Sequence, residues 1–202
     1  MSKPASRKRT PSSGPAYQLK ITLKGSQPPI WRRLQVPADC KLETLHWAIQ
    51  MAMGWEDDHL HCFHIEGHEY MGRDPMGGKM DSDGEDAALY RLSDLVRDEK
   101  AKFTYEYDFG DDWNHTIVLE KIISAGDAAL ADSPNGFACL AGKGACPPED
   151  CGGIWGYYSK LEILQNPKHP SHAEMMEWMG HHDPDAFELA AVNKKMSRIQ
   201  FD

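Results

Sequence analysis

Hydrophobic and polar residues alternate in several segments of the chain. The alternation runs through residues 17–24, 30–36, 61–66, 103–109 and 115–122. A period of two residues is typical of strands with one buried face. Gly67 predicts a turn into a short partner strand at 69–71, and the turn residues at 110–112 predict a hairpin between the last two strands.

A helical period replaces this alternation over residues 42–53. Apolar residues recur there every three or four positions, which predicts an amphipathic helix packed on the sheet. Asp39 is the expected N-cap, and Gly54 is the expected end of the helix. A short helical turn is predicted at 91–96, between the strands.

The C-terminal part of the chain has helical signals only. Residues 157–164 predict a short helix, Ser171 opens a second as part of a capping box, and Asp183-Pro184 is the expected start of a third. Strands, one helix, strands and then helices predict an α+β fold. We expect a mainly antiparallel sheet packed by one helix after the second strand, with a C-terminal helical segment.

Charge divides the chain into two parts. The 202 residues carry a net charge of −9, yet residues 1–16 carry four basic and no acidic side chains. These basic residues are Lys3, Arg7, Lys8 and Arg9. We expect a disordered basic tail at 1–16 and one α+β domain at 17–202. An acidic body is a poor partner for a phosphate backbone, so contact with nucleic acid is expected only through the tail.

Location is predicted from the absence of export and membrane signals. No apolar run reaches the length of about 18 residues needed to cross a bilayer, and the N-terminal segment has no apolar stretch of a secretory signal. We therefore expect a cytoplasmic protein that does not contact membranes. The five cysteines are then expected as free or metal-bound thiols.

Three cysteines lie close together in a segment rich in Gly and Pro. Cys139, Cys146 and Cys151 are spaced C-x6-C-x4-C, and Gly and Pro disfavour both a regular helix and a central strand there. The segment predicts a rigid loop. Three thiolates and one histidine would complete a tetrahedral zinc site. The candidates for the histidine are His59, His61, His64 and His115. The alternative is a structural loop with buried, inert thiols.

Carboxylates and histidines form two further candidate metal sites. Asp108, Asp111, Asp112 and His115 lie within eight residues at the predicted hairpin tip, where they could hold a divalent cation or act as acid and base. Asp and Gly are also the residues that turns prefer, so an ordinary turn is the alternative. His59 and His61, one strand repeat apart, are possible ligands on a strand or else packed side chains. The common nucleotide-binding, hydrolase and metalloprotease motifs do not occur.

Several of these segments together resemble the Ri-plasmid ORF-3-like proteins. The similar segments are 17–24, Ile30-Trp-Arg-Arg33, Met53-Gly-Trp55, His59-Leu-His61-x-Phe63, Arg91-Leu-Ser-Asp-Leu95, Tyr105-Glu-Tyr-Asp-Phe-Gly-Asp-Asp-Trp113-x-His115, Cys139-Leu-Ala-Gly142, Ala145-Cys-Pro-Pro-Glu-Asp150 with Gly152-Gly153, and Phe187 with Val192-Asn193. The resemblance implies a compact α+β domain. It also implies a gene carried on plasmids or as a passenger of insertion elements, where such proteins are also labelled TnpR-like resolvases.

Three functional hypotheses follow. The first is a non-enzymatic interaction or structural module associated with mobile elements, with an unknown protein partner. The second is a metal-dependent hydrolase that uses the Asp/His cluster at the hairpin tip with His59 and His61. The third is an accessory factor that contacts DNA through the basic tail. Zinc is the candidate cofactor.

Overall fold

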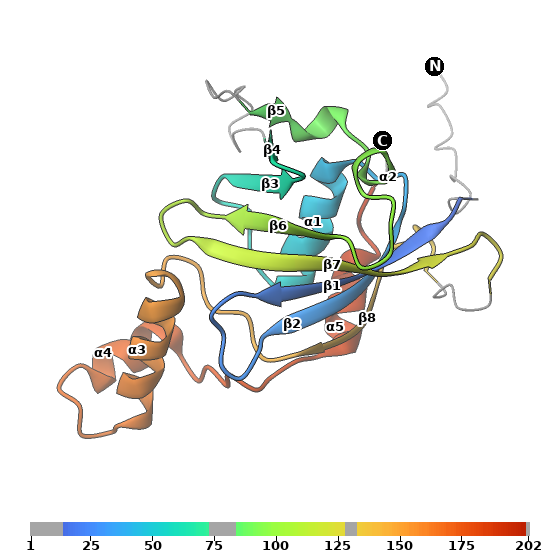
Figure 1. Cartoon of the computed structure of the whole chain (residues 1–202). Coiled ribbons are helices and arrows are strands. Elements are labelled where there is room, and N and C mark those ends of the chain that lie inside the picture. Colours follow the sequence, from blue (N-terminus) through green and yellow to red (C-terminus); the bar gives the residue numbers. More distant parts are fainter. Residues whose placement is uncertain (1–13, 73–83, 128–132, 201–202) are drawn as a thin grey trace, which may run out of the picture.

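An eight-stranded, mostly antiparallel sheet forms the centre of the protein (Figure 1). This computed structural model describes residues 14–72, 84–127 and 133–200. The strand order is β5-β4-β3-β6-β7-β1-β2-β8. The strands are β1 (Ala16–Leu23), β2 (Trp31–Pro37), β3 (His61–Ile65), β4 (His68–Met71), β5 (Glu85–Asp86), β6 (Lys102–Tyr107), β7 (Trp113–Ile123) and β8 (Ala138–Lys143). The predicted α+β class is therefore confirmed.

The alternating segments form strands as their pattern predicts. In β1, Leu19, Ile21 and Leu23 are almost completely buried, while the residues between them are partly exposed. The strands β6 and β7 pair as the expected hairpin, with Tyr107 opposite Trp113. The aromatic face of this hairpin is buried. The hairpin tip lies at one end of the sheet (Figure 1).

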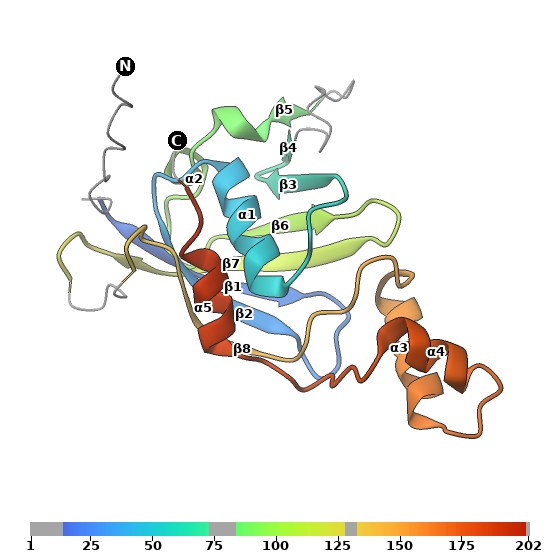
Figure 2. The same cartoon turned by 180° about the vertical axis from the view of Figure 1, so that it is seen from behind.

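Two helices cover the same face of the sheet (Figure 2). The helix α1 (Leu42–Met53) buries most of its residues, and its C-cap Gly54 has a left-handed φ of 114°, as the glycine signal predicts. Beside it lies α5 (Leu189–Met196), which contacts both α1 and β8. The sequence predicted the packing of α1 but not that of α5, which carries fewer apolar residues overall.

The helices α3 (Gly153–Gln165) and α4 (His172–Met179) lie beside one end of the sheet and not on its face (Figure 1). They contact each other, and α4 has no buried residue. Trp155 on α3 is 84% exposed. This pair of helices is therefore a lobe with little core of its own. Short helical elements occur at η1 (Ala87–Leu89) and α2 (Leu92–Leu95).

Some local predictions were wrong. Lys41, not Asp39, is the N-cap of α1, and no side chain caps the helix. The last helix begins at Leu189, because Asp183-Pro184 forms a turn and not a helix start. The first part of the cysteine segment is not a loop: Cys139 lies in β8, which pairs with β2 at the edge of the sheet formed by the described residues. An edge strand tolerates Gly better than a central strand does.

Parts of the predicted organisation lie outside the described residues. Residues 1–13 of the predicted basic tail are among them. Within the described part of the chain, no helix is both long enough and apolar enough to span a membrane.

Candidate functional site

One histidine ring nitrogen is surrounded by three carboxylates from two separate segments. The Nε2 atom of His59 lies 3.1 Å from Asp150 Oδ1, 3.5 Å from Glu149 Oε2 and 3.6 Å from Asp108 Oδ2. This Nε2 atom is buried, and no hydrogen bond reaches it from the described residues. The contacts are therefore within ion-pair distance but lack hydrogen-bond geometry. We call His59, Asp108, Glu149 and Asp150 the open group.

Backbone conformation places Asp108 in this group. Asp108 follows β6 with a left-handed φ of 57°, a conformation that Asp adopts more easily than most residues. Its Oδ1 atom accepts hydrogen bonds from the backbone N–H groups of Gly110 (2.9 Å) and Asp111 (3.3 Å). The turn thereby fixes the carboxylate, and Oδ2 remains directed toward His59.

Close contact with the hairpin tip holds the segment that carries Glu149 and Asp150. The backbone N–H of Gly152 donates to Asp111 Oδ2 at 3.0 Å. A Cβ atom on Gly153 would lie 2.3 Å from the Asp111 carbonyl oxygen, so only glycine allows this approach. The Asp111 side chain thus acts on the position of the open group without belonging to it.

Glu149 is the best-positioned acid of the open group. It accepts hydrogen bonds from the Tyr107 hydroxyl (3.0 and 3.1 Å) and from the backbone N–H of Glu56 (2.7 Å). Burial raises the pKa of the Glu149 carboxyl, although these hydrogen bonds oppose the shift. Glu149 is therefore a fixed proton acceptor beside His59.

A second group of metal-ligating side chains lies in the core. Donor atoms of His46, Asp57 and His61 lie within 4.8 Å of one another. The Asp57 carboxylate can only accept, so the ring proton of His46 is on Nε2, which donates to Asp57 Oδ1 at 2.7 Å. His46 Nδ1 then accepts from the Tyr105 hydroxyl at 2.8 Å, and that hydroxyl accepts from Gln50 Nε2 at 3.0 Å. We call His46, Asp57 and His61 the closed group.

Stacking and burial complete the closed group. The rings of His46 and His61 stack with centroids 3.5 Å apart and planes at 6°. Burial lowers the pKa of His46 to about 3 and that of His61 well below its usual value. Both rings are therefore neutral at pH 7, and the single proton of His46 is used within the protein.

His115 belongs to the core and not to the hairpin-tip cluster. Its ring is completely buried and lies 5.3 Å from the ring of Trp55 and 5.5 Å from that of Tyr105, between centroids. Burial lowers the pKa of His115 to about 4. Asp112 lies at the tip and accepts from Asn114 Nδ2. Of the four residues predicted together at the tip, only Asp108 joins the open group.

The cysteine segment does not gather its thiols around a histidine. Among the described residues, neither group of mutually close metal-ligating side chains includes a cysteine. Each of two thiols donates to a nearby carbonyl oxygen, Cys139 to Ala141 (3.5 Å) and Cys151 to Gly153 (3.9 Å). Burial raises the pKa of all three thiols, to about 11 for Cys139 and about 12 for Cys151. Zinc on Cys139, Cys146 and Cys151 stays a prediction without geometric support.

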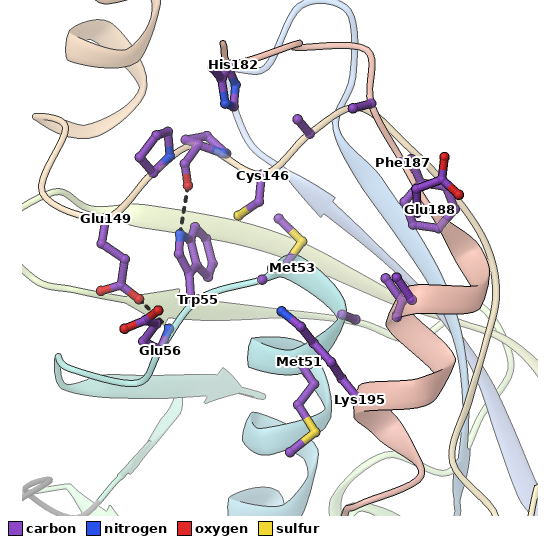
Figure 3. Close-up of a pocket in the computed structure, with 18 of the residues that line it drawn as sticks. Met51, Met53, Trp55, Glu56, Cys146, Glu149, His182, Phe187, Glu188 and Lys195 are labelled. Atoms are coloured by element: carbon purple, nitrogen blue, oxygen red, sulfur yellow. Dashed lines mark hydrogen bonds between the residues drawn. The ribbon is translucent and has the colours of Figure 1, made fainter. Parts of the chain in front are cut away.

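A pocket of about 710 Å³ adjoins the open group (Figure 3). Glu149 and Glu56 lie at one end, Trp55 and Cys146 line the middle, and Lys195 and Phe187 lie at the other end. The Trp55 ring nitrogen donates to the Pro147 carbonyl at 3.1 Å. The pocket has the size of small-molecule binding sites. Glu149 is the member of the open group that lines it, beside Glu56.

Sequence reasoning predicted His59 and Asp108 but missed Glu149 and Asp150. It also missed His46 and Asp57 of the closed group, and it placed His59 on a strand that begins only at His61. The run Pro147-Pro-Glu-Asp150 was the available signal, since two prolines stiffen the backbone before two adjacent acids.

Comparisons with known proteins identify one family and two similar proteins. The family model for plasmid pRiA4b ORF-3-like proteins matches residues 15–191. The "Uncharacterized protein y4hQ" of Sinorhizobium fredii is 40% identical over 186 residues, which cover 90% of this chain and 91% of that protein. The crystal structure of MM3350, a protein of unknown function from Methanosarcina mazei Go1, matches with a TM-score of 0.73 and 34% identity over 92% of this chain and 98% of that one.

Proposed function

Because the chain belongs to the plasmid pRiA4b ORF-3-like family, and the relatives above are named without an activity, we propose a function from the site itself. We propose that the open group binds a divalent cation and that the protein is a metal-dependent hydrolase acting in the adjoining pocket. His59, Asp108 and Asp150 are the proposed ligands, and Glu149 is the proposed base.

The spacing around His59 Nε2 carries this proposal. Ligand atoms bound at about 2.1 Å to one cation lie about 3.0–3.4 Å from each other in octahedral or tetrahedral geometry. The three carboxylate oxygens lie 3.1–3.6 Å from His59 Nε2. A protonated His59 would instead donate a hydrogen bond to one of them, and no contact has that geometry.

The donor set favours zinc or manganese. Imidazole suits zinc, and carboxylates suit manganese and other hard cations. Three protein ligands leave a coordination position for water, as in catalytic metal sites. A bound cation lowers the pKa of such a water, and Glu149, held by Tyr107 and Glu56, is placed to accept its proton.

Titration calorimetry with Zn²⁺ and Mn²⁺ on chelator-treated protein tests the proposal. Asp108→Asn is expected to weaken binding by at least about tenfold, because an amide replaces an anionic ligand. Asp112→Asn is the matched control, since Asp108 and Asp112 have φ angles of 57° and 56° in the same turn. Equal affinities of these two variants, or no binding by the unaltered protein, would refute the cation site.

Hydrolysis needs its own measurement. Metal-loaded protein is expected to cleave members of a panel of phosphate and carboxylate esters, and Glu149→Gln is expected to lose turnover while it retains the metal. If the protein binds metal but cleaves no ester of the panel, the hydrolase function is rejected and a cation-binding function remains.

One observation favours the non-enzymatic interaction module as a second candidate. Trp155 is 84% exposed and Trp178 is 47% exposed on the α3–α4 lobe, and exposed aromatic residues are enriched at protein interfaces. A photo-crosslinking residue at position 155 is expected to yield one discrete protein adduct in cells. The same probe at Glu162, exposed on the same helix, is the control; equal labelling from both positions would reject this candidate.

A further inference from the structure

Arg32 is a buried cation without an acidic partner among the described residues. The residue is 2% exposed on β2. Its Nε donates to the carbonyl of Ala52 (2.7 Å), and its Nη1 donates to the carbonyls of Trp31 (2.9 Å) and Lys143 (3.1 Å). No ion pair formed within the described part of the chain includes Arg32. Burying a charge is costly unless an opposite charge compensates it.

The guanidinium is held rigidly with one nitrogen available. Its three hydrogen bonds to described residues use Nε and Nη1 and leave Nη2. The ring of Phe187 stacks against the guanidinium, with Cζ of Arg32 4.6 Å from the ring centroid. A Cβ atom on Gly142 would lie 2.6 Å from the Phe187 ring and 2.9 Å from Arg32 Cδ. Glycine at 142 therefore permits a stack that fixes the orientation of Arg32.

Arg32 and Lys195 line the same pocket. The Lys195 side chain extends from α5 toward Met53, and its ammonium points to the side of the pocket on which Trp55 and Glu56 lie (Figure 3). The two cations also share a neighbour, because the charges of both lower the pKa of the Cys146 thiol against the larger effect of burial. The pocket thus has the acids Glu149 and Glu56 on one wall and a cation on each of the elements β2 and α5.

The other acids that line the pocket are Asp58, Asp183 and Glu188, and none of them forms an ion pair with Arg32 among the described residues. Burial lowers the pKa of Arg32, and the neighbouring thiols of Cys146 and Cys139 oppose that shift. An oxyanion in the pocket would accept hydrogen bonds from Nη2 and from the Lys195 ammonium, which are the donors that bind carboxylate and phosphate groups best.

We propose that Arg32 and Lys195 form an oxyanion site that holds the phosphate or carboxylate group of a small organic ligand. One part of this inference rests on the proposed function: the cation of the open group would face the same ligand from the side of the pocket where Glu149 lies. The volume of about 710 Å³ is that of a site for a small molecule and not for a polymer.

Titration of the full chain with inorganic phosphate and with acetate, in the presence of a chelator, tests the oxyanion site apart from the cation site. We expect saturable binding of at least one anion, with sodium chloride at equal ionic strength as the reference. Binding of phosphate alone would assign a phosphorylated ligand, and binding of acetate alone would assign a carboxylate. Failure of both anions to bind above the reference overturns the inference.

Two lysines supply a matched pair for this titration. Lys195→Ala is expected to weaken anion binding about fivefold or more, because one charged hydrogen bond is lost. Lys194→Ala is expected to leave it unchanged, since Lys194 is exposed on the same helix and does not line the pocket. Arg32→Lys, which keeps the charge without the planar fork, should weaken binding further. If that variant does not fold, the lysine pair decides, and equal affinities of the two lysine variants overturn the site.

The cation and oxyanion results are separable. Anion binding in chelator without any metal affinity would retain the oxyanion site and reject the proposed function. Metal binding with no anion binding would retain the proposed function and overturn the inference.

Discussion

The open and closed groups both consist of histidines and acidic residues, and some of these residues alternate along the chain. The two groups differ in the hydrogen bonds of their ring nitrogens. Asp57 and His61 of the closed group flank His59 of the open group in the chain. In the closed group, the His46 proton is donated to Asp57 and both imidazoles are buried and neutral. In the open group, His59 Nε2 has carboxylates around it and no hydrogen bond from them.

The difference lies in which bonds the protein itself completes. The Asp57 carboxylate, which can only accept, fixes the tautomer of His46, so His46 Nε2 already has its partner. Within the described residues, neither His59 Nε2 nor His61 Nε2 of the closed group has a hydrogen-bond partner. The two groups therefore differ at His46 Nε2, which is already paired, and in the carboxylates around His59 Nε2.

The largest expected effect is the loss of stability in acid that follows from neutral, buried histidines. His115 has a pKa of about 4 when folded and about 6.5 when unfolded. The unfolded chain binds the extra proton, so stability is complete above pH 6.5 and decreases as the pH falls toward 4. This shift corresponds to a loss of roughly 3 kcal/mol.

Urea unfolding between pH 7 and 4 measures this effect. His115→Phe keeps an aromatic ring and removes the titration, so the free energy of unfolding should depend less steeply on pH. A slope equal to that of the unaltered protein would show that His115 is not neutral and buried.

Truncation of the two groups should give opposite results. His46→Ala is expected to cost about 3 kcal/mol of stability, because it leaves a cavity and unpairs Tyr105 and Asp57. His59→Ala should cost less than about 1 kcal/mol, since His59 is partly exposed and its Nε2 makes no hydrogen bond. Metal affinity should follow the reverse order. If His46→Ala loses the metal while it remains folded and His59→Ala keeps it, the metal binds the closed group and the assignment to the open group is wrong.

A smaller effect is expected from the contact that positions the open group. Gly153→Ala places a Cβ atom 2.3 Å from the Asp111 carbonyl oxygen and should cost about 2 kcal/mol and weaken metal binding. Gly126→Ala is the control, because Gly126 also has a positive φ but no atom within 4 Å of the added Cβ. Calorimetry and urea unfolding compare the two. Unchanged metal affinity in Gly153→Ala would show that the hairpin tip does not position Glu149 and Asp150.

The sequence predicted most of the fold because periodicity is a local property. The alternating segments became strands, and residues 42–53 became α1 with Gly54 at its end. The errors lie where tertiary contacts decide: β8 forms despite its glycine because β2 offers an edge, and α5 is fixed by contacts with α1.

The candidate site was predictable only in part. His59 and Asp108 were singled out by residue type, but the sequence could not bring Glu149 and Asp150 beside them, since these acids are about 90 positions away from His59. The sequence also could not show that His115 is buried in the core and lies apart from the acids at the hairpin tip. An alternating pattern does not reveal which face of a hairpin the helices cover.

Anomalous X-ray diffraction from crystals soaked in Mn²⁺ would locate a bound cation at one of the two groups. We expect one peak within about 2.2 Å of His59 Nε2, Asp108 Oδ2 and Asp150 Oδ1, and none between His46 and His61. A peak at the closed group, or no peak at the open group with the pocket accessible in the lattice, would contradict this expectation.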